Sequence, residues 1–522
     1  MADLAVKDVR ETCNVKSSSW WPGLALCLFL ALVGRSVISY APYSIAWDEL
    51  YFLHRAVCVD RAVYALSLTR IGECYGSLSK SPIMTFLTLP WGPLGAGEAG
   101  VGLALVTLGI LTWLVILIVY TAAASLKASR IVLLLAGACI YLNPFLRGYA
   151  GGFLADALVA WAVAGSLLLV PLEAYGEGTR NGWQDALRGL MWAFLFGIGA
   201  LSKVSFGFFL IVVAPLAIIY RWRRCGRRSA LVTTGAALAG SLPAILVWLA
   251  FGRNFVGHAV QASFGGLAKF YAAAGSSERT YLREYFRASG YAVIPLAALL
   301  LYFLWSLHAQ RRQLFARVVP VLMLAAFLIL CGLSPNQDYR FSMPVMIALP
   351  ILLAVAPHRA KGLTAPGRTT LALAVLAGSL LSFPMVARPD MSFVRYASDI
   401  LERYGSPNTT ILLATDHPYL NIETFLLAQQ IGGERLRTVR LGTLVYDYVN
   451  NRPLAWSLDR TSKADIVLFH RPPLYPDPPW ANQFASQFRD QAEKSGSLTE
   501  SGKYLDVFRK NVPPAAPFHS GR

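Results

Sequence analysis

Long apolar runs separated by short polar segments extend from about residue 20 to residue 387. A helix needs about 20 apolar residues to cross a bilayer, and shorter helices also cross where they pack against one another. By this criterion we expect about eleven membrane-spanning helices, with a range of roughly 10 to 13. Their approximate positions are 20–40, 100–123, 130–146, 153–172, 189–203, 205–220, 229–252, 291–308, 317–334, 341–356 and 368–387. The pattern therefore predicts a polytopic α-helical membrane protein.

One apolar stretch, residues 81–95, does not fit this series. It is short and is interrupted by Pro82, Pro90 and Pro93. Prolines break the helical hydrogen-bond ladder, and counting the stretch as a span would invert every loop that follows it. We expect a re-entrant or interfacial helix within the first outer loop, residues 41–99.

The composition changes after residue 388 to that of a soluble domain. Alternating and periodic patterns predict strands at 409–414, 437–445, 464–469 and 504–509, with helices at 420–431 and 480–495. Residues 388–511 are thus expected to form a small α/β domain, and the proline-rich tail 512–522 is expected to be disordered. The transmembrane part, 20–387, then forms the other domain.

Basic residues in short loops set the expected orientation, because such loops stay in the cytoplasm. They are concentrated at 221–228, 311–312 and 358–361, and the three loops alternate consistently. The N-terminal segment 1–19 is then cytoplasmic, while the loop 41–99 and the C-terminal domain lie outside. The expected location is a bacterial inner membrane, with the C-terminal domain in the periplasm.

Composition supports this interpretation and excludes others. Of 522 residues, 55% are hydrophobic and only 15% are charged, which is more apolar surface than a soluble core buries. The net charge of +18 follows from the topology of the basic loops, so no nucleic-acid partner is expected. The seven cysteines contain no C-x-x-C pair that would indicate a zinc site. Cys58 and Cys74 share the expected outer loop, where oxidation is possible. The sequence leaves open whether they form a disulfide.

Candidate chemistry begins directly after the first span, at Trp47-Asp48-Glu49. Adjacent carboxylates at a membrane boundary are costly unless they are solvated or used. They could instead simply begin an exposed helix and complement its dipole. Further polar groups expected on the same side, Lys80, Asp156 and Arg340, favour a functional role.

Several motifs in order resemble those of the GT-C glycosyltransferases, in particular the aminoarabinose transferase and protein O-mannosyltransferase branch. They are Trp47-Asp48-Glu49, the stretch from Tyr75 to Pro82 that includes Lys80, Asn143-Pro144 followed by Asp156, Leu201-Ser202-Lys203, and Tyr339-Arg340-Phe341-Ser342-Met343-Pro344. The resemblance covers about residues 20–388 and implies a GT-C fold. It implies that Asp48 faces the acceptor, that Lys80 contacts the carrier phosphate although Ser81 replaces the usual proline, and that Asp156 lies near the active centre.

The chemistry requires these residue types. An acceptor hydroxyl must lose a proton as it attacks the anomeric carbon, and Asp48 is the candidate base, with Glu49 in support. An amine or a phosphate is the other kind of acceptor expected. Lys80, Arg340 and Arg55 would stabilise the leaving lipid phosphate, and Asp156 and Tyr339 would complete the active centre. A single displacement would invert the anomeric carbon. No metal site and no obligatory cofactor are expected, although Glu49 could bind a divalent cation.

The expected partners are a polyprenyl-phosphate sugar donor, membrane lipids and an acceptor that is a cell-envelope glycolipid, a glycan or a protein. Two other functions compete with this one. A transporter or flippase would also hold intramembrane charges, but it commonly shows two halves with matching hydropathy, which this sequence lacks. A scaffold would explain the C-terminal domain but not the charged groups elsewhere. The sugar, the acceptor and the oligomeric state are left open.

Overall fold

The fold is taken from a computed structural model, which describes two groups of residues separated by gaps. The first comprises 43–44, 47–76, 80, 82–86, 89, 130–141, 143, 155–175, 182–204, 206–265, 268, 289–309, 314–333 and 342–354. The second comprises 389–414, 417, 419–433, 435–445, 447, 452–470, 486, 498–501 and 504–509. The expected spans 20–40, 100–123 and 368–387 and the expected helix 480–495 lie outside the described residues, apart from residue 486.

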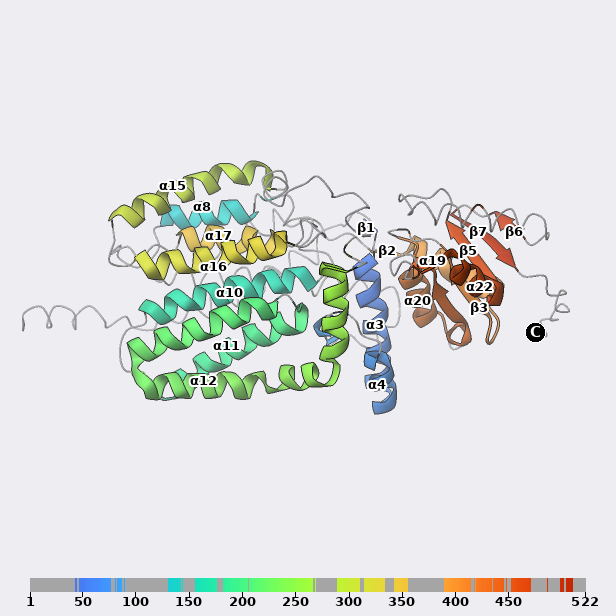
Figure 1. The fold of residues 1–522 in the computed structure, drawn as a ribbon, viewed down its shortest axis with the longest axis horizontal. Coiled ribbons are helices and arrows are strands. Elements are labelled where there is room, and N and C mark those ends of the chain that lie inside the picture. The colour runs from blue at the N-terminus through green and yellow to red at the C-terminus, as the bar shows by residue number, and fades with distance from the viewer. Residues whose placement is uncertain are drawn as a thin grey trace, which may run out of the picture.

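A bundle of apolar helices forms the larger part of the molecule (Figure 1). Its members are α8 (Arg130–Tyr141), α10 (Ala155–Tyr175), α11 (Gly182–Ser202), α12 (Phe206–Ser263), α15 (Val293–Ala309), α16 (Leu314–Gly332) and α17 (Met343–Ala354). A 3-10 turn, η2 (Gly290–Ala292), precedes α15. These helices correspond one by one to the expected spans from 130 to 356, except that α12 joins two of them.

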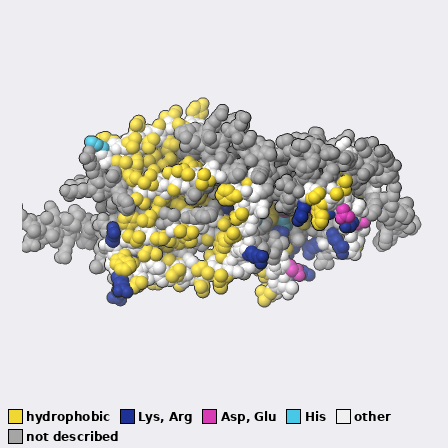
Figure 2. Space-filling model, in the orientation of Figure 1, with side chains coloured by type: hydrophobic (Ala, Val, Ile, Leu, Met, Phe, Trp, Pro, Cys, Tyr) yellow, Lys and Arg dark blue, Asp and Glu magenta, His cyan; other side chains and the backbone are white. Residues whose placement is uncertain are grey.

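The outer surface of this bundle is apolar. The described side chains of α10 and those of α17 are almost all buried, whereas Ile211, Leu249 and Leu301 on peripheral helices are 72, 79 and 69% exposed. Hydrophobic side chains cover the side of the bundle that Figure 2 shows. So large an exposed apolar surface is stable only against lipid, so the chain is an integral membrane protein.

Three helices within the described part of the chain are long and apolar enough to cross a membrane: Gly182–Ser202, Cys225–Ala250 and Gly290–His308. Shorter apolar helices occupy Leu158–Leu167, Val318–Ile329 and Met343–Ala354. The total of about eleven spans stays a prediction.

Helices α11 and α12 form a closely packed hairpin. A Cβ atom added at Gly240 would lie 2.8 Å from the Cβ of Ala193, and one at Gly189 would collide with the backbone of Thr233. Small residues let two membrane helices approach in this way. Helix α12 itself breaks at Gly226, where φ is 83° and ψ is 169°. This left-handed conformation suits glycine and separates the two expected spans 205–220 and 229–252.

Helices α3 (Trp47–Tyr64), α4 (Leu68–Gly76) and α5 (Ile83–Phe86) build the described part of residues 41–99, the expected first outer loop. In Figure 1, α3 runs across the end of the bundle, between the bundle and the C-terminal domain. Cys58 of α3 and Cys74 of α4 form a disulfide, so the outcome that the sequence left open is resolved. Of the expected re-entrant or interfacial segment 81–95, the described residues show only the single turn α5.

The C-terminal domain contains a five-stranded mixed sheet with strand order β4-β3-β5-β7-β6. Its elements are β2 (Pro389–Asp390), α19 (Ser392–Tyr404), β3 (Thr410–Leu413), α20 (Ile422–Ile431), η5 (Leu436–Thr438), β4 (Arg440–Thr443), α22 (Leu454–Lys463), β5 (Ile466–His470), β6 (Leu498–Ser501) and β7 (Leu505–Arg509). Strand β3 is parallel to β4 and β5, and β7 is antiparallel to β5 and β6. The four expected strands are present, whereas α19, α22 and β6 were not expected.

A small pairing connects this domain to the first outer loop. Strand β1 (Tyr43–Ser44) lies parallel to β2, with Tyr43 opposite Pro389. Apolar residues of α3, including Leu50 and Leu53, share one buried cluster with the ends of the membrane helices and with the core of the C-terminal domain. Helix α3 is therefore held from both sides.

Candidate active site

The first turn of α3 carries the acidic pair that the sequence singles out. Asp48 and Glu49 both lie there, where the helix dipole stabilises negative charge. Successive residues of an α-helix are rotated by about 100°, so the two carboxylates leave the helix in different directions. Asp48, Tyr51 and Arg55 share one face of α3, while Glu49 is turned away from it and is buried. The motif thus supplies one carboxylate to this face.

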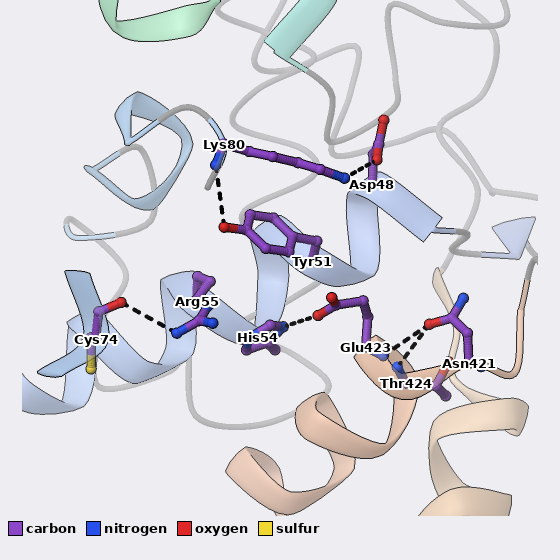
Figure 3. A network of polar contacts seen from close by, with 9 residues as sticks. All are labelled: Asp48, Tyr51, His54, Arg55, Cys74, Lys80, Asn421, Glu423 and Thr424. Atoms are coloured by element: carbon purple, nitrogen blue, oxygen red, sulfur yellow. Dashed lines mark hydrogen bonds and ion pairs between the residues drawn. The ribbon is translucent and has the colours of Figure 1, made fainter. Parts of the chain in front are cut away.

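Asp48 forms an ion pair with Lys80. Lys80 Nζ lies 2.5 Å from Asp48 Oδ1, and both side chains are about a quarter exposed, 23% for Lys80 and 28% for Asp48. The backbone N–H of Lys80 donates a hydrogen bond to the hydroxyl of Tyr51 at 3.3 Å, and its ammonium lies 4.9 Å from the centre of the Tyr51 ring. Figure 3 shows these three side chains converging. Tyr51, which the sequence does not single out, therefore positions Lys80 against Asp48.

Arg55 lies on the other side of the same tyrosine. Its guanidinium is 5.8 Å from the centre of the Tyr51 ring, and Nη1 donates to the backbone carbonyl of Cys74 at 3.3 Å. Because the disulfide fixes Cys74 to α3, this carbonyl is a rigid acceptor. Arg55 thus contributes a second positive charge near Lys80, one helical turn along α3 from Tyr51.

A second pair of Asp and Lys lies at the same end of the bundle. Asp156, in the first turn of α10, accepts from Lys203 Nζ at 2.5 Å, directly after α11. Ala155 and Leu158, which flank Asp156, belong to the buried cluster that contains the apolar face of α3. The structure therefore brings Asp156 to the region of Asp48 and pairs it with a lysine from another of the resembling motifs.

His258 approaches the Asp48–Lys80 pair from the last part of α12, beyond the apolar stretch that ends at Ala250. Burial lowers the pKa of its imidazole to about 4. The positive charge of Lys80 also lowers this pKa, whereas the negative charge of Asp48 raises it. Near neutral pH the imidazole is uncharged and can donate or accept one hydrogen bond. No sequence motif surrounds His258, so only the fold identifies it as a neighbour of the pair.

The C-terminal domain also contacts α3. His54 Nδ1 lies 2.8 Å from Glu423 Oε2, and Arg61 donates to the backbone carbonyl of Gln430; both partners belong to α20. Burial by itself raises the pKa of the Glu423 carboxyl, but the nearby charges of His54, Lys80 and Arg55 outweigh it and leave that pKa below its usual value. His54 therefore faces the C-terminal domain rather than Lys80.

The remaining expected residues cannot be placed. Tyr339 and Arg340 lie outside the described residues. In the described part of the chain, no three side chains of His, Cys, Asp or Glu gather so that they could hold a metal ion. Of the residues singled out by the sequence, the structure therefore places four at the candidate site: Asp48, Lys80, Arg55 and Asp156.

Comparison with known proteins shows similarity in structure. Neither a family model nor a curated protein matches the sequence. The structure of ArnT from Cupriavidus metallidurans bound to undecaprenyl phosphate matches 96% of this chain and 100% of its own, with a TM-score of 0.54 and 15% identity. ArnT in the apo state matches 94% of this chain and 98% of its own, with a TM-score of 0.53 and 15% identity. The Archaeoglobus fulgidus oligosaccharyltransferase in the apo form covers 88% of this chain and 70% of its own, with a TM-score of 0.43 and 11% identity.

The two ArnT structures decide the fold. Their similarity extends over nearly the whole of both chains, so it includes the membrane bundle as well as the C-terminal domain. At 15% identity, this similarity establishes the fold only. The chemistry has to be argued from the residues of the site. The expected GT-C architecture is therefore confirmed.

Proposed function

We propose that this chain, an integral membrane protein with the fold of ArnT, is a glycosyltransferase that uses a polyprenyl-phosphate sugar as its donor. The observation that carries the proposal is the pair of Asp48 and Lys80, 2.5 Å apart and partly exposed at the end of the bundle where the C-terminal domain docks. A carboxylate and an ammonium are the two groups that sugar transfer from a lipid phosphate requires.

The donor is proposed to bind through its phosphate. ArnT has been observed with undecaprenyl phosphate, and that lipid presents a charged phosphate at the end of an apolar chain. Lys80 and Arg55, both next to the Tyr51 ring, supply positive charge for such a group, and Arg340 would add to it. The apolar bundle beside them suits the polyprenyl chain.

The ion pair suggests an order of events. Without a donor, Lys80 neutralises Asp48, so the carboxylate is a poor base. A phosphate that binds Lys80 competes with Asp48 for the ammonium and releases the carboxylate for the acceptor hydroxyl. Activation of the base would then be coupled to donor binding.

The proposed step is a single displacement. The acceptor oxygen forms a bond to the anomeric carbon of the sugar while the bond from that carbon to the phosphate oxygen breaks. The bonding pair leaves on the polyprenyl phosphate, whose additional charge Lys80 stabilises. The proton of the acceptor hydroxyl moves to Asp48, and the anomeric carbon is inverted. Asp156, which is held by Lys203 at the same end of the bundle, is proposed to contribute to sugar binding.

Transfer is tested with purified protein in liposomes, a panel of undecaprenyl-phosphate sugars and a glycolipid extract of bacterial membranes. Asp48→Asn should lower kcat by roughly 100- to 10,000-fold, because the general base is lost. Lys80→Ala should lower kcat by roughly 100-fold or more and raise KM for the donor, because the leaving phosphate loses its cation.

A matched control comes from the surface of the C-terminal domain. Asp459 and Lys463 form an exposed ion pair at 2.7 Å on α22. Removal of such a pair has little effect on stability, so Asp459→Asn should leave kcat within twofold of the wild type. An Asp48→Asn variant that is folded and as active as this control would exclude Asp48 as the base. If the wild type transfers no sugar but carries a lipid-linked or polar solute across the same liposomes, the protein is a transporter.

A further inference from the structure

Helix α3 has two polar rows, and they point in different directions. Asp48, Tyr51 and Arg55 form the row that faces Lys80. His54 and Arg61 form the second row, which faces α20 of the C-terminal domain. At about 100° per residue, the two rows are separated by roughly 90° around the helix axis. The rotation of α3 about its own axis therefore determines how both rows meet their partners.

The second row is matched on α20 with the same spacing. His54 and Arg61 are seven residues apart, and so are their partners Glu423 and Gln430. Seven residues are nearly two helical turns, so each helix presents both groups on one side. The two helices therefore run in parallel with two polar contacts between them, and buried apolar side chains of both helices belong to one cluster. This interface fixes the register of α3 against the domain.

Glu423 is itself held firmly. It lies in the first turn of α20, where the helix dipole stabilises its charge, and its backbone N–H donates to the N-cap Asn421 at 2.9 Å. Asn421 and Thr424 complete a reciprocal capping box. The side chain of Glu423 is 15% exposed and that of His54 is 4% exposed, so water screens their contact poorly. Figure 3 shows Glu423 directed at His54 from the capped end of α20.

The charge of Glu423 also reaches the candidate active site. Lys80 and Arg55 are among the cations that stabilise its carboxylate, and both belong to the group around Tyr51. Glu423 does not contact the reacting groups of the proposed transfer. It acts on them through His54 and α3.

From these observations we infer that Glu423 is a positioning residue for the candidate active site. By holding His54, it fixes the rotation of α3 and thereby the direction in which Asp48 faces Lys80. The C-terminal domain is then part of the catalytic machinery rather than an appended module. This inference rests on the proposed function, since its effect appears in the rate of sugar transfer.

The test measures kcat and the donor KM for variants of the full chain in liposomes, with the undecaprenyl-phosphate sugar and glycolipid extract that the wild type uses. Glu423→Gln should lower kcat by roughly tenfold or more, because a small misplacement of a reacting group is costly. The donor KM should stay within about twofold, because Lys80 and Arg55 remain. His54→Gln should have the same effect, and the double variant should be no worse than the more impaired single one.

Arg61→Met is the matched control. It removes the other polar contact between the same two helices, farther along α3 from Asp48, and should lower thermal stability about as much as Glu423→Gln. If the domain merely needs to be docked, both variants lower kcat alike, and the inference is wrong. If Glu423 positions α3 at the site, only Glu423→Gln lowers kcat, while Arg61→Met stays within twofold of the wild type.

Other outcomes are equally informative. Should Glu423→Gln fail to fold, His54→Gln tests the same contact from the side of α3. If the wild type is active, Asp48→Asn is impaired and neither Glu423→Gln nor His54→Gln differs from the wild type, the proposed function stands and the inference falls. If the wild type transfers no sugar, both fall.

Discussion

The buried ion pair at the opposite end of the bundle allows a quantitative prediction. Asp185, in the first turn of α11, pairs with Arg221 of α12, and the two residues are 4 and 1% exposed. Thr233 donates to the backbone carbonyl of Asp185 at 3.2 Å, which connects the pair to the second half of α12. The pair therefore connects the three helical segments that meet near the break at Gly226.

Asp185→Asn keeps the shape of the side chain but removes its charge. Arg221 cannot lose its proton, so its buried guanidinium would lose the counter-ion that Asp185 provides. Breaking one member of a buried pair costs about 3 to 5 kcal/mol of unfolding free energy. Replacement of both residues by apolar ones, as in Asp185→Leu with Arg221→Met, should cost much less, because no uncompensated charge remains.

The assay is reversible unfolding in mixed detergent and lipid micelles, followed by far-UV circular dichroism. The surface variant Asp459→Asn serves as the reference and should change the unfolding free energy by less than about 1 kcal/mol. Residues 185 and 203 are separated by roughly 27 Å along α11, at 1.5 Å per residue, so kcat of the folded variant should be unchanged. An Asp185→Asn variant within about 1 kcal/mol of the wild type would refute the reasoning, and so would a double variant less stable than the single one.

Two further predictions concern the end of the bundle at which the C-terminal domain lies. Replacing both Cys58 and Cys74 by Ser opens a loop with a sequence separation of 16 and should lower the unfolding free energy by about 3 kcal/mol. Thermal unfolding with and without a reductant measures this, and a wild type insensitive to the reductant would contradict it. The second prediction follows from His258, whose pKa lies near 4 in the folded chain against an ordinary value of 6.5. As the pH falls from 6.5 to about 4 the unfolded chain takes up this proton first, so the folded protein loses at most about 3 kcal/mol of stability. His258→Gln should flatten the pH dependence of the unfolding midpoint in this window, and an unchanged profile would show that His258 does not cause it.

Hydropathy predicted the bundle well because burial in lipid acts on each helix separately. The expected spans 130–146, 153–172, 291–308, 317–334 and 341–356 each contain or nearly contain one observed helix. We expected α11 to begin at residue 189, whereas it begins at Gly182. The expectation was wrong because a search for consecutive apolar residues excludes the charged Asp185. The partner that neutralises Asp185 comes from the following helix. Local hydropathy contains no information about that contact.

The site was predictable only in part, for a similar reason. Asp48 and Lys80 are each recognisable within a short motif, and the structure brings them together across 32 residues of sequence. Tyr51, His258 and Glu423 have no motif of their own. Tyr51 matters because it contacts Lys80, Glu423 because its helix packs against α3, and His258 because it lies close enough to Lys80 and Asp48 to respond to their charges. Contacts of this kind depend on tertiary structure, so a single sequence does not reveal them.

The arrangement explains how a soluble domain without a motif of its own can be required at a membrane site. The carboxylate at position 48 must be aimed at a lysine from a different segment, and α3 alone has nothing that sets its rotation. The disulfide to α4 restrains one side of the helix, and the contact of His54 with Glu423 restrains another. Two restraints on different sides of a helix fix both its position and its rotation, which one restraint cannot do. In the proposed transferase, the membrane bundle would supply the place for the lipid donor, and the C-terminal domain would supply the precision with which Asp48 meets it.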